Sequence, residues 1–155
     1  MTKPKFKLSI EVSCRTKVPH YYKDLVRQMA RRSLFHIPGA VSRQRQPWTL
    51  SVCFVDQPRM KALNRQFRMK NKVTDVLSFP RVAQKGVSGD LGDIVICWPQ
   101  AKRQAKAYGT PAASELRRLI AHGVLHLFGY DHERSKLQAR KMFSLQEEIL
   151  EKEYP

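Results

Sequence analysis

Cysteines and long apolar runs are both scarce in this chain of 155 residues. The three cysteines, Cys14, Cys53 and Cys97, lie far apart beside apolar residues. An odd number without a paired spacing argues against a disulfide framework and against a cysteine zinc knuckle, so we expect three buried structural thiols. No stretch approaches the ~18 consecutive apolar residues of a membrane span. The start alternates apolar and polar residues like a strand, unlike a signal peptide, which predicts a soluble, cytoplasmic protein.

Acidic residues are also scarce, with 13 Asp and Glu against 29 Lys and Arg, a net charge of +16. Residues 1–72 carry 17 basic and 3 acidic side chains, whereas residues 73–155 are nearly balanced. An excess this large and this uneven favours a polyanionic partner, because phosphates neutralised by basic side chains release counterions. An anionic membrane surface would also suit the charge. No segment combines a basic face with an exposed apolar one, however, so nucleic acid is the predicted partner.

The apolar periodicity predicts one small domain, α+β or mixed α/β, with a sheet of about four strands. Basic and glycine-containing loops are expected at residues 38–47 and 81–92. The predicted strands are residues 5–14, 48–55, 73–79 and the run opened by Asp93, and the predicted helices are one bearing Tyr22 to Leu34, one capped by Asp56, a short one at Pro99, and residues 111–128 and 135–152.

The helix predicted at residues 111–128 is the best defined. Thr110 suits its N-cap, Pro111 its first position, and Glu115 lies near its positive end. An apolar stripe with the helical period runs along it from Leu116 to Leu127. This helix therefore has one face toward the core and can carry polar side chains in a fixed arrangement.

Three of the five histidines, His122, His126 and His132, lie in one segment of eleven residues that covers the end of this helix and the residues after it. Two histidines four apart project from one helical face and can take adjacent positions on one metal ion. Gly129 can adopt the left-handed conformation that ends a helix, so the chain can return His132 as a third ligand. Three protein ligands leave one position of a tetrahedral zinc for water, which is the arrangement of a catalytic site.

The histidine spacing also matches that of the metzincin zinc proteases, with one departure. Those proteases place a glutamate directly after the first histidine as general base, whereas this chain has Gly123. Peptide cleavage is therefore disfavoured, and a glycine there also allows another backbone to pack closely.

Asp131, Glu133 and Glu115 are the remaining candidates for a general base. Asp131 and Glu133 flank the third histidine, and Glu115 lies seven residues before His122 on the same helical face. Each also suits a helix cap, a surface charge or the orientation of a metal ligand, and the sequence does not choose among them. His20 and His36 have no ligand spacing and are expected to be surface or packing residues.

The segment His122-Gly-Val-Leu-His126-Leu-Phe-Gly-Tyr-Asp-His132 resembles the signature of the YbeY family of bacterial endoribonucleases. Two further stretches agree with that family in order and spacing. They are Leu63-Asn-Arg-Gln-Phe-Arg68 followed by Thr74-Asp-Val-Leu-Ser-Phe-Pro80, and Gly92-Asp-Ile-Val-Ile96. The resemblance covers about residues 48–150.

The resemblance implies a single zincin-like α+β domain over residues 1–155, with one mixed sheet of about four strands and about five helices. His122, His126 and His132 match the family's ligands to one Zn²⁺ or another divalent transition ion, and His122 and Arg68 match its catalytic residues. We assign Arg68 to phosphate binding or to transition-state charge, because a guanidinium binds phosphate oxygens bidentately.

The implied activity is that of a metal-dependent hydrolase of phosphodiester bonds, a single-strand-specific endoribonuclease. Its implied substrate is rRNA, notably the 3′ end of 16S rRNA, with the small ribosomal subunit as a partner in ribosome maturation and quality control. Two alternatives remain open, a metzincin-like peptidase and a non-catalytic ribosome-assembly factor with a structural metal. Three imidazoles also suit nickel or cobalt, so the sequence does not fix the native metal.

Overall fold

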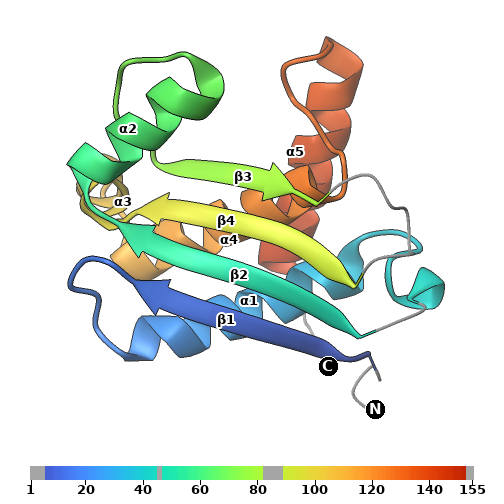
Figure 1. Ribbon diagram of the computed structural model, residues 1–155. Helices are drawn as coiled ribbons and strands as arrows, with labels where there is room; N and C mark the ends of the chain where they lie inside the picture. Colours follow the sequence, from blue (N-terminus) through green and yellow to red (C-terminus); the bar gives the residue numbers. More distant parts are fainter. Residues whose placement is uncertain (1–5, 45–46, 82–88, 153–155) are drawn as a thin grey trace.

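The computed structural model describes residues 6–44, 47–81 and 89–152, without the side chain of Arg43. This part of the chain forms one four-stranded sheet with five α-helices, as predicted (Figure 1). The elements in chain order are β1 (Leu8–Cys14), α1 (Tyr21–His36), the short 3₁₀ helix η1 (Val41–Arg43), β2 (Trp48–Val55), α2 (Gln57–Arg68), β3 (Val76–Pro80), β4 (Asp90–Cys97), α3 (Trp98–Ala107), α4 (Ala112–Leu127) and α5 (Lys136–Glu151).

The sheet is mixed, with the strand order β1-β2-β4-β3. β1, β2 and β4 are parallel to one another, and β3 runs antiparallel to β4 at one edge (Figure 1). Val52 of β2 lies opposite Ile94 of β4, and Val95 of β4 lies opposite Leu77 of β3. Since successive side chains of a strand point to opposite faces, Val52 and Ile94 face one side of the sheet, and Val95 and Leu77 the other.

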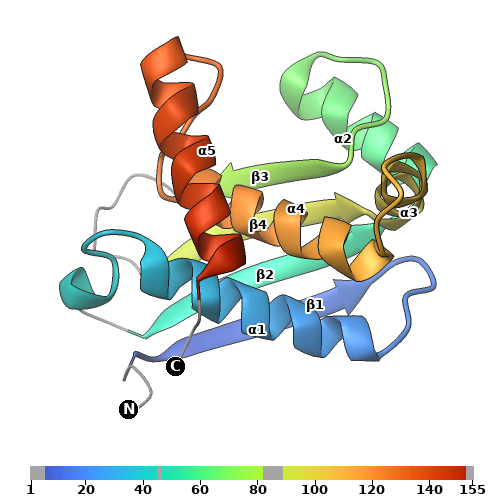
Figure 2. The same cartoon turned by 180° about the vertical axis from the view of Figure 1, so that it is seen from behind.

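The larger core lies between the sheet and α1, α3, α4 and α5 (Figure 2). Helix α4 packs on β3 and β4. Its Leu116, Leu119, Ile120 and Val124 are fully buried, as the apolar stripe predicts. Helix α5 packs on α4 from outside, so the last turns of α4 lie between a strand layer and a second helix.

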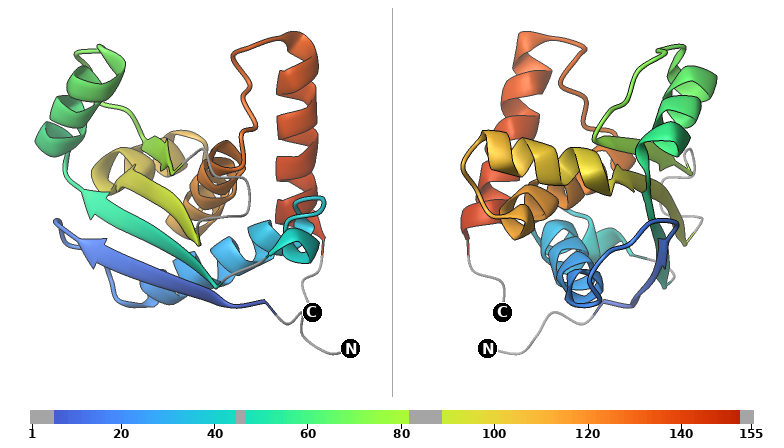
Figure 3. Two further views of the ribbon diagram at one scale, coloured as in Figure 1. Left: turned by 45° about the vertical axis from the view of Figure 1, so that its right-hand side comes forward. Right: turned by 90° about the vertical axis from the view of Figure 1, so that its left-hand side faces the viewer.

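The smaller core lies on the opposite face of the sheet, beneath α2. Met60 of α2 packs there with Val55, Leu77, Val95 and Cys97. Helices α2 and α5 consequently rise on opposite sides of β3 (Figure 3). The two cores hold the sheet from both faces and fix the position of α2 relative to α4.

Of the two predicted helix caps, Asp56 is confirmed and Thr110 is not, and Ser135 caps α5 without having been predicted to do so. Asp56 accepts a hydrogen bond from the backbone N–H of Arg59, and Ser135 accepts one from that of Gln138. The prediction for Thr110 is wrong. Pro111, in an extended conformation, is the N-cap of α4, because the helix begins at Ala112, one residue later than expected.

The strand boundaries shift by a few residues. β1 begins at Leu8, β3 begins at Val76 and includes Pro80, and β4 begins at Asp90 rather than at Asp93. Pro80 can continue β3 because β3 is an edge strand and the Pro80 nitrogen points away from β4, where no hydrogen bond is needed. Residues 82–88 of the expected loop, and residues 5, 45 and 46, lie outside the described part of the chain.

All three cysteines are free thiols, but only Cys97 is buried, whereas Cys14 and Cys53 are partly exposed. The prediction of three buried thiols is therefore wrong for two of them. Cys14 ends an edge strand of the sheet, which leaves one side of it uncovered. None of the described helices has the length and hydropathy needed to cross a membrane.

Candidate metal centre

A glycine turn at the end of α4 sets up the site. Gly129 has φ +89, and its N–H donates to the His126 carbonyl at 3.0 Å. The Tyr130 N–H donates to the Leu125 carbonyl at 3.1 Å, which completes the Schellman pattern of hydrogen bonds. The helix therefore ends where the sequence predicts, and the chain turns back so that His132 lies beside the last turn of α4.

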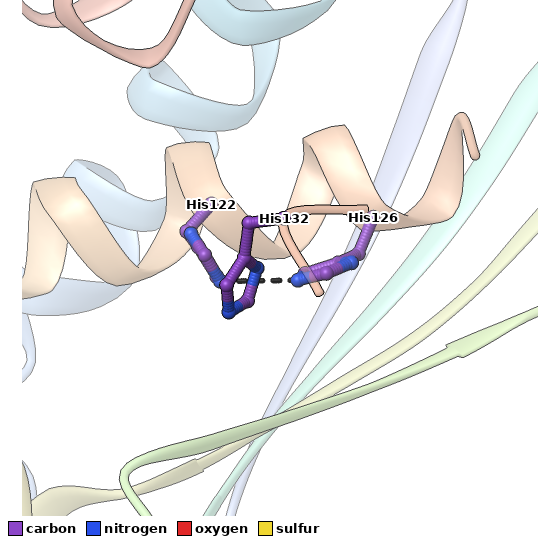
Figure 4. Close-up of side chains that lie close together, drawn as sticks. All are labelled: His122, His126 and His132. Carbon is purple, nitrogen blue, oxygen red and sulfur yellow. Dashed lines mark hydrogen bonds between the residues drawn. The ribbon is translucent and has the colours of Figure 1, made fainter. Parts of the chain in front are cut away.

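The three predicted histidines converge, as Figure 4 shows. The Nε2 atoms of His122 and His126 are 3.0 Å apart, and one ring nitrogen from each of the three residues lies within 4.8 Å of the others. The ring of His132 approaches from the following loop, with its centroid 5.0 Å from that of His122 and 5.3 Å from that of His126. Spacings of this size let three imidazoles contact one ion.

Gln146 on α5 orients the first histidine. Its side-chain oxygen accepts a hydrogen bond from Nδ1 of His122 at 2.8 Å, and the residue is only 7% exposed. An oxygen acceptor at Nδ1 places the proton of the neutral ring there and leaves the Nε2 lone pair for a metal. Sequence reasoning missed Gln146. A signal was present, because Gln146 shares a helical face with the apolar Met142 and Ile149.

The environment favours the neutral form of His122 and His126. Burial lowers the pKa of His122 to about 4, against a smaller raising effect of the Gln146 hydrogen bond, and the neighbouring His126 and His132 lower it further. The pKa of His126 is lowered by burial and by His132. A metal binds the unprotonated ring, so these shifts favour coordination near neutral pH.

The donor set suits a transition metal. Three imidazole nitrogens without a carboxylate fit zinc and its neighbours rather than magnesium or calcium. In addition, Nδ1 of His132 is buried and has no hydrogen-bond partner among the described residues. A buried polar atom without a partner costs free energy, which a bound group or water would offset. The site therefore fits a metal ion such as zinc.

Arg68, the last residue of α2, lies beside this centre. Its guanidinium is 3.6 Å from the Glu133 carboxylate, one residue after His132, and its charge contributes to the lowered pKa of His126. The Arg68 side chain is 43% exposed, so it is held loosely by this pair and remains open to an anion. The contact bridges α2 and the histidine loop, which lie on opposite sides of β3 (Figure 3).

The three candidate carboxylates have different surroundings. Glu115 is 3% exposed, and its oxygens accept hydrogen bonds from Arg118 at 2.6 Å and from Gln104 at 2.8 Å. It belongs to an ion network that also includes Asp75, 3.4 Å from Arg118. Glu115 thus holds α3, α4 and the start of β3 together.

Asp131 lies closer to the histidines. Its carboxylate accepts the Glu133 backbone N–H at 2.9 Å, which is the main cause of its lowered pKa, and Arg134 and the nearby histidines lower that pKa further. Asp131 is therefore one of the charged groups that act on His126, whereas Glu115 is not among the groups that shift the pKa of His122 or His126.

Gly123 lies against the sheet, between the first two histidine turns. A Cβ at this position would meet three side-chain atoms of Ile94 at 3.0 to 3.3 Å. The close neighbour is thus a side chain of β4 rather than another backbone. A glutamate as in the metzincins does not fit here without displacing fully buried Ile94.

One aromatic residue near the centre was not predicted. Phe143 of α5 is 42% exposed, and its ring centroid is 5.6 Å from that of His132 and 6.4 Å from that of His122. It shields one side of the histidine rings, which contributes to their burial. His20 and His36, at the two ends of α1, do not belong to the described histidine cluster, as expected.

Known proteins are similar to this chain in sequence and in fold. A sequence profile for the family described as endoribonuclease YbeY matches residues 11–153. A protein named endoribonuclease YbeY from Persephonella marina is 51% identical over 104 residues, which are 66% of this chain and 68% of that protein. A protein of the same name from Myxococcus xanthus is 50% identical over 104 residues, or 65% of this chain and 35% of its own length.

A solved structure agrees as well. The solution structure of a Thermotoga maritima protein superposes with a TM-score of 0.61 at 27% identity, covering 92% of this chain and 87% of that one. The profile match extends the likeness to both sides of the histidine segment and includes β2, α2 and α5. From these matches, the chain belongs to the YbeY endoribonuclease family.

Proposed function

We propose that this protein is a metal-dependent endoribonuclease that hydrolyses phosphodiester bonds at the centre formed by His122, His126 and His132. The observation that carries the proposal is the convergence of three imidazoles, with 3.0 Å between the first two Nε2 atoms. The relatives named endoribonuclease YbeY, up to 51% identical, support RNA as the substrate. The proposed functional unit is the whole chain, residues 1–155, as one domain.

The proposed cofactor is one zinc ion. When bound, such an ion would lower the pKa of a water molecule to about 7 and polarise the oxygen under attack. The protein's part is to supply three imidazole nitrogen donors, with Gln146 holding His122 in the required tautomer. Partial burial of the three rings limits the access of solvent to their donor atoms.

Arg68 supplies the positive charge for the substrate. A guanidinium offers paired N–H donors that match two phosphate oxygens, and it can also stabilise charge that develops on them. In the free protein the guanidinium rests 3.6 Å from the exposed Glu133. A phosphate at the histidines would compete with that weak ion pair for Arg68.

Asp131 and Glu133 are the proposed proton acceptors. Both are near His132, and the lowered pKa of Asp131 keeps it ionised at neutral pH. Glu115 is less suited, because Arg118 and Gln104 already occupy its oxygens. Of the three carboxylates, Glu115 therefore has a structural role in the proposal.

The finer substrate assignment is single-stranded rRNA, at the 3′ end of 16S rRNA, during maturation and quality control of the small ribosomal subunit. The support is the family resemblance together with the net charge of +16, which favours a large polyanion. Phosphate-rich ribosomal particles meet that requirement. We place this activity in the cytoplasm, where ribosomes are assembled.

Metal analysis paired with RNA cleavage tests the proposal. Mass spectrometry of freshly purified protein should give about one zinc per chain, and His122→Ala/His126→Ala should lose it. Cleavage of a single-stranded rRNA fragment should be lost in the same variant. His20→Ala, at an exposed histidine outside the cluster, is the matched control and should keep both.

Other results would point elsewhere. Metal without RNA cleavage, and rRNA maturation that survives His126→Ala, would indicate an assembly factor with a structural metal. Cleavage of an unstructured peptide with RNA left intact would indicate a peptidase. Fresh protein without metal would contradict the metal centre.

A further inference from the structure

A row of basic side chains runs along α2 and ends at the candidate centre. Lys61, Arg65 and Arg68 are spaced i, i+4 and i+7, so they lie on one face of the helix. We call these three residues the α2 stripe. Seven residues of helix rise about 10 Å, which is long enough to contact more than one phosphate of an RNA strand.

The stripe is exposed because the other side of α2 is anchored. Met60 and Asn64 are buried, and the side-chain N–H of Asn64 donates to the Lys72 carbonyl at 2.9 Å. All three side chains of the stripe lie on the exposed side of the helix. The helix is therefore fixed on the sheet and presents its charged face outward.

The charge of the stripe is almost uncompensated. The sequence from Gln57 to Thr74 contains six basic residues and no acidic one. In the described part of the chain, Arg68 pairs with Glu133, and no carboxylate pairs with Lys61 or Arg65. Basic residues in a last helical turn stabilise the helix dipole, which accounts for Arg65 and Arg68. It does not account for Lys61, two turns earlier.

One end of the stripe is placed at the histidines. Arg68 contacts Glu133, the residue after His132, whereas Lys61 lies two turns further from the end of α2. Helix α2 rises away from β3 on the side opposite α5 (Figure 3). The stripe thus forms a line of positive charge that leads from the centre onto the surface of α2.

We propose that the α2 stripe binds successive backbone phosphates of the RNA strand that enters the three-histidine centre. This inference rests on the proposed function and adds the path of the substrate. Arg68 contacts the phosphate at or next to the cleaved bond, and Arg65 and Lys61 contact the phosphates that follow along α2. Because they contact phosphates rather than bases, the stripe adds affinity without base specificity.

Binding of a labelled single-stranded RNA of about ten nucleotides to the metal-loaded protein tests the inference. Fluorescence anisotropy gives the affinity at several salt concentrations, and a gel confirms that the RNA is intact at the end of each titration. The test variant is Lys61→Ala/Arg65→Ala, which leaves Arg68 in place. The matched control is Arg103→Ala/Lys106→Ala, which removes one arginine and one lysine from the exposed side of α3, a helix that packs on the opposite face of the sheet.

The stripe variant should bind about tenfold more weakly near 0.1 M salt. Its plot of log affinity against log salt should be shallower by about 1.4, because each lost phosphate contact on a single strand removes about 0.7 from the slope. The control should keep the wild-type slope and lie within about twofold of the wild-type affinity. Circular dichroism and metal content should be unchanged in both variants, because none of the four residues is buried.

An equal loss in both variants would overturn the inference, since general charge would then explain binding. An unchanged affinity of the stripe variant would overturn it as well. The proposed function is judged separately by cleavage. Wild type that cleaves RNA while the stripe variant binds normally refutes only the stripe, and stripe-dependent binding without cleavage refutes only the nuclease.

Discussion

His122 and Gln146 are 24 residues apart in sequence, yet their side chains meet at 2.8 Å where α5 crosses α4. This contact connects the metal centre to the C-terminal helix. It means that the orientation of a ligand depends on how α5 packs, through Met142 and Ile149, against the core.

Gln146→Leu should weaken metal binding without unfolding the protein. The leucine fills a similar volume but leaves Nδ1 of His122 without an acceptor, and loss of such a partner costs about 10- to 100-fold in metal affinity. Competition with a chelator of known affinity measures the loss. Gln146→Glu should retain binding, because its oxygen also accepts from Nδ1.

Gln138→Leu, elsewhere on α5, is the control for a general effect of the substitution. Equal affinity of wild type and Gln146→Leu would show that the hydrogen bond does not position His122.

The metal-free protein should lose stability as the pH falls from 6.5 toward 4. An unfolded histidine titrates near 6.5, while burial holds the pKa of folded His122 at about 4. In that interval the unfolded chain takes up a proton and the folded chain does not, so the stabilisation is complete above pH 6.5 and lost toward pH 4. Urea unfolding after chelation, at a series of pH values, measures the change.

Carboxylates also titrate near the lower end of this pH range. The pH dependence of the wild type is therefore compared with that of His122→Gln. The wild type should fall more steeply than this variant between pH 6.5 and 4.5, and parallel curves would contradict the lowered pKa.

Arg118→Met should destabilise the protein by about 3 kcal/mol, because it leaves the buried Glu115 carboxylate without its charge partner. Glu115 would keep only the hydrogen bond from Gln104. The double variant Glu115→Gln/Arg118→Met should recover most of the loss, since no buried charge remains. Urea unfolding measures each variant near pH 7.

Arg117→Met, at the exposed neighbouring position, is the control and should change the free energy of unfolding little. A double variant less stable than Arg118→Met would show that the pair acts through something other than charge.

Gly123→Ala should cost about 1 kcal/mol in the wild type. Its methyl group would meet the Ile94 side chain at 3.0 Å, and overpacking of this kind outweighs the helix propensity gained from alanine. In an Ile94→Val background the closest atom, Cδ1, is absent while Cγ2 and Cγ1 remain at 3.1 and 3.3 Å, so the same change should cost less. Thermal unfolding of the wild type, the two single variants and the double variant measures both effects. An equal effect of Gly123→Ala in the two backgrounds would refute the close packing against Ile94.

The centre was largely predictable because its ligands are local in sequence. The spacing of His122 and His126, and Gly129 at the helix end, determine where the rings can lie. Gln146 was missed because its contact depends on the packing of a distant helix. The N-cap of α4 was misplaced because Thr110 and Pro111 both suit a helix start. The extended backbone of Pro111 makes that residue the N-cap, and the sequence does not show this conformation.

The partial exposure of Cys14 and Cys53 has a similar origin. Apolar neighbours predict a strand but not which strand lies at an edge or which face a helix covers. The sheet order β1-β2-β4-β3 depends on contacts between distant segments, which no local pattern contains.

Pro80 has a consequence for how the molecule behaves in a crowded solution. The Arg81 N–H donates inward to Leu91, so by alternation the Pro80 nitrogen faces the open edge of the sheet. That nitrogen carries no hydrogen and cannot donate to an incoming strand. The end of β3 is therefore protected against edge-to-edge aggregation, beside a centre that has to stay accessible to a long polymer.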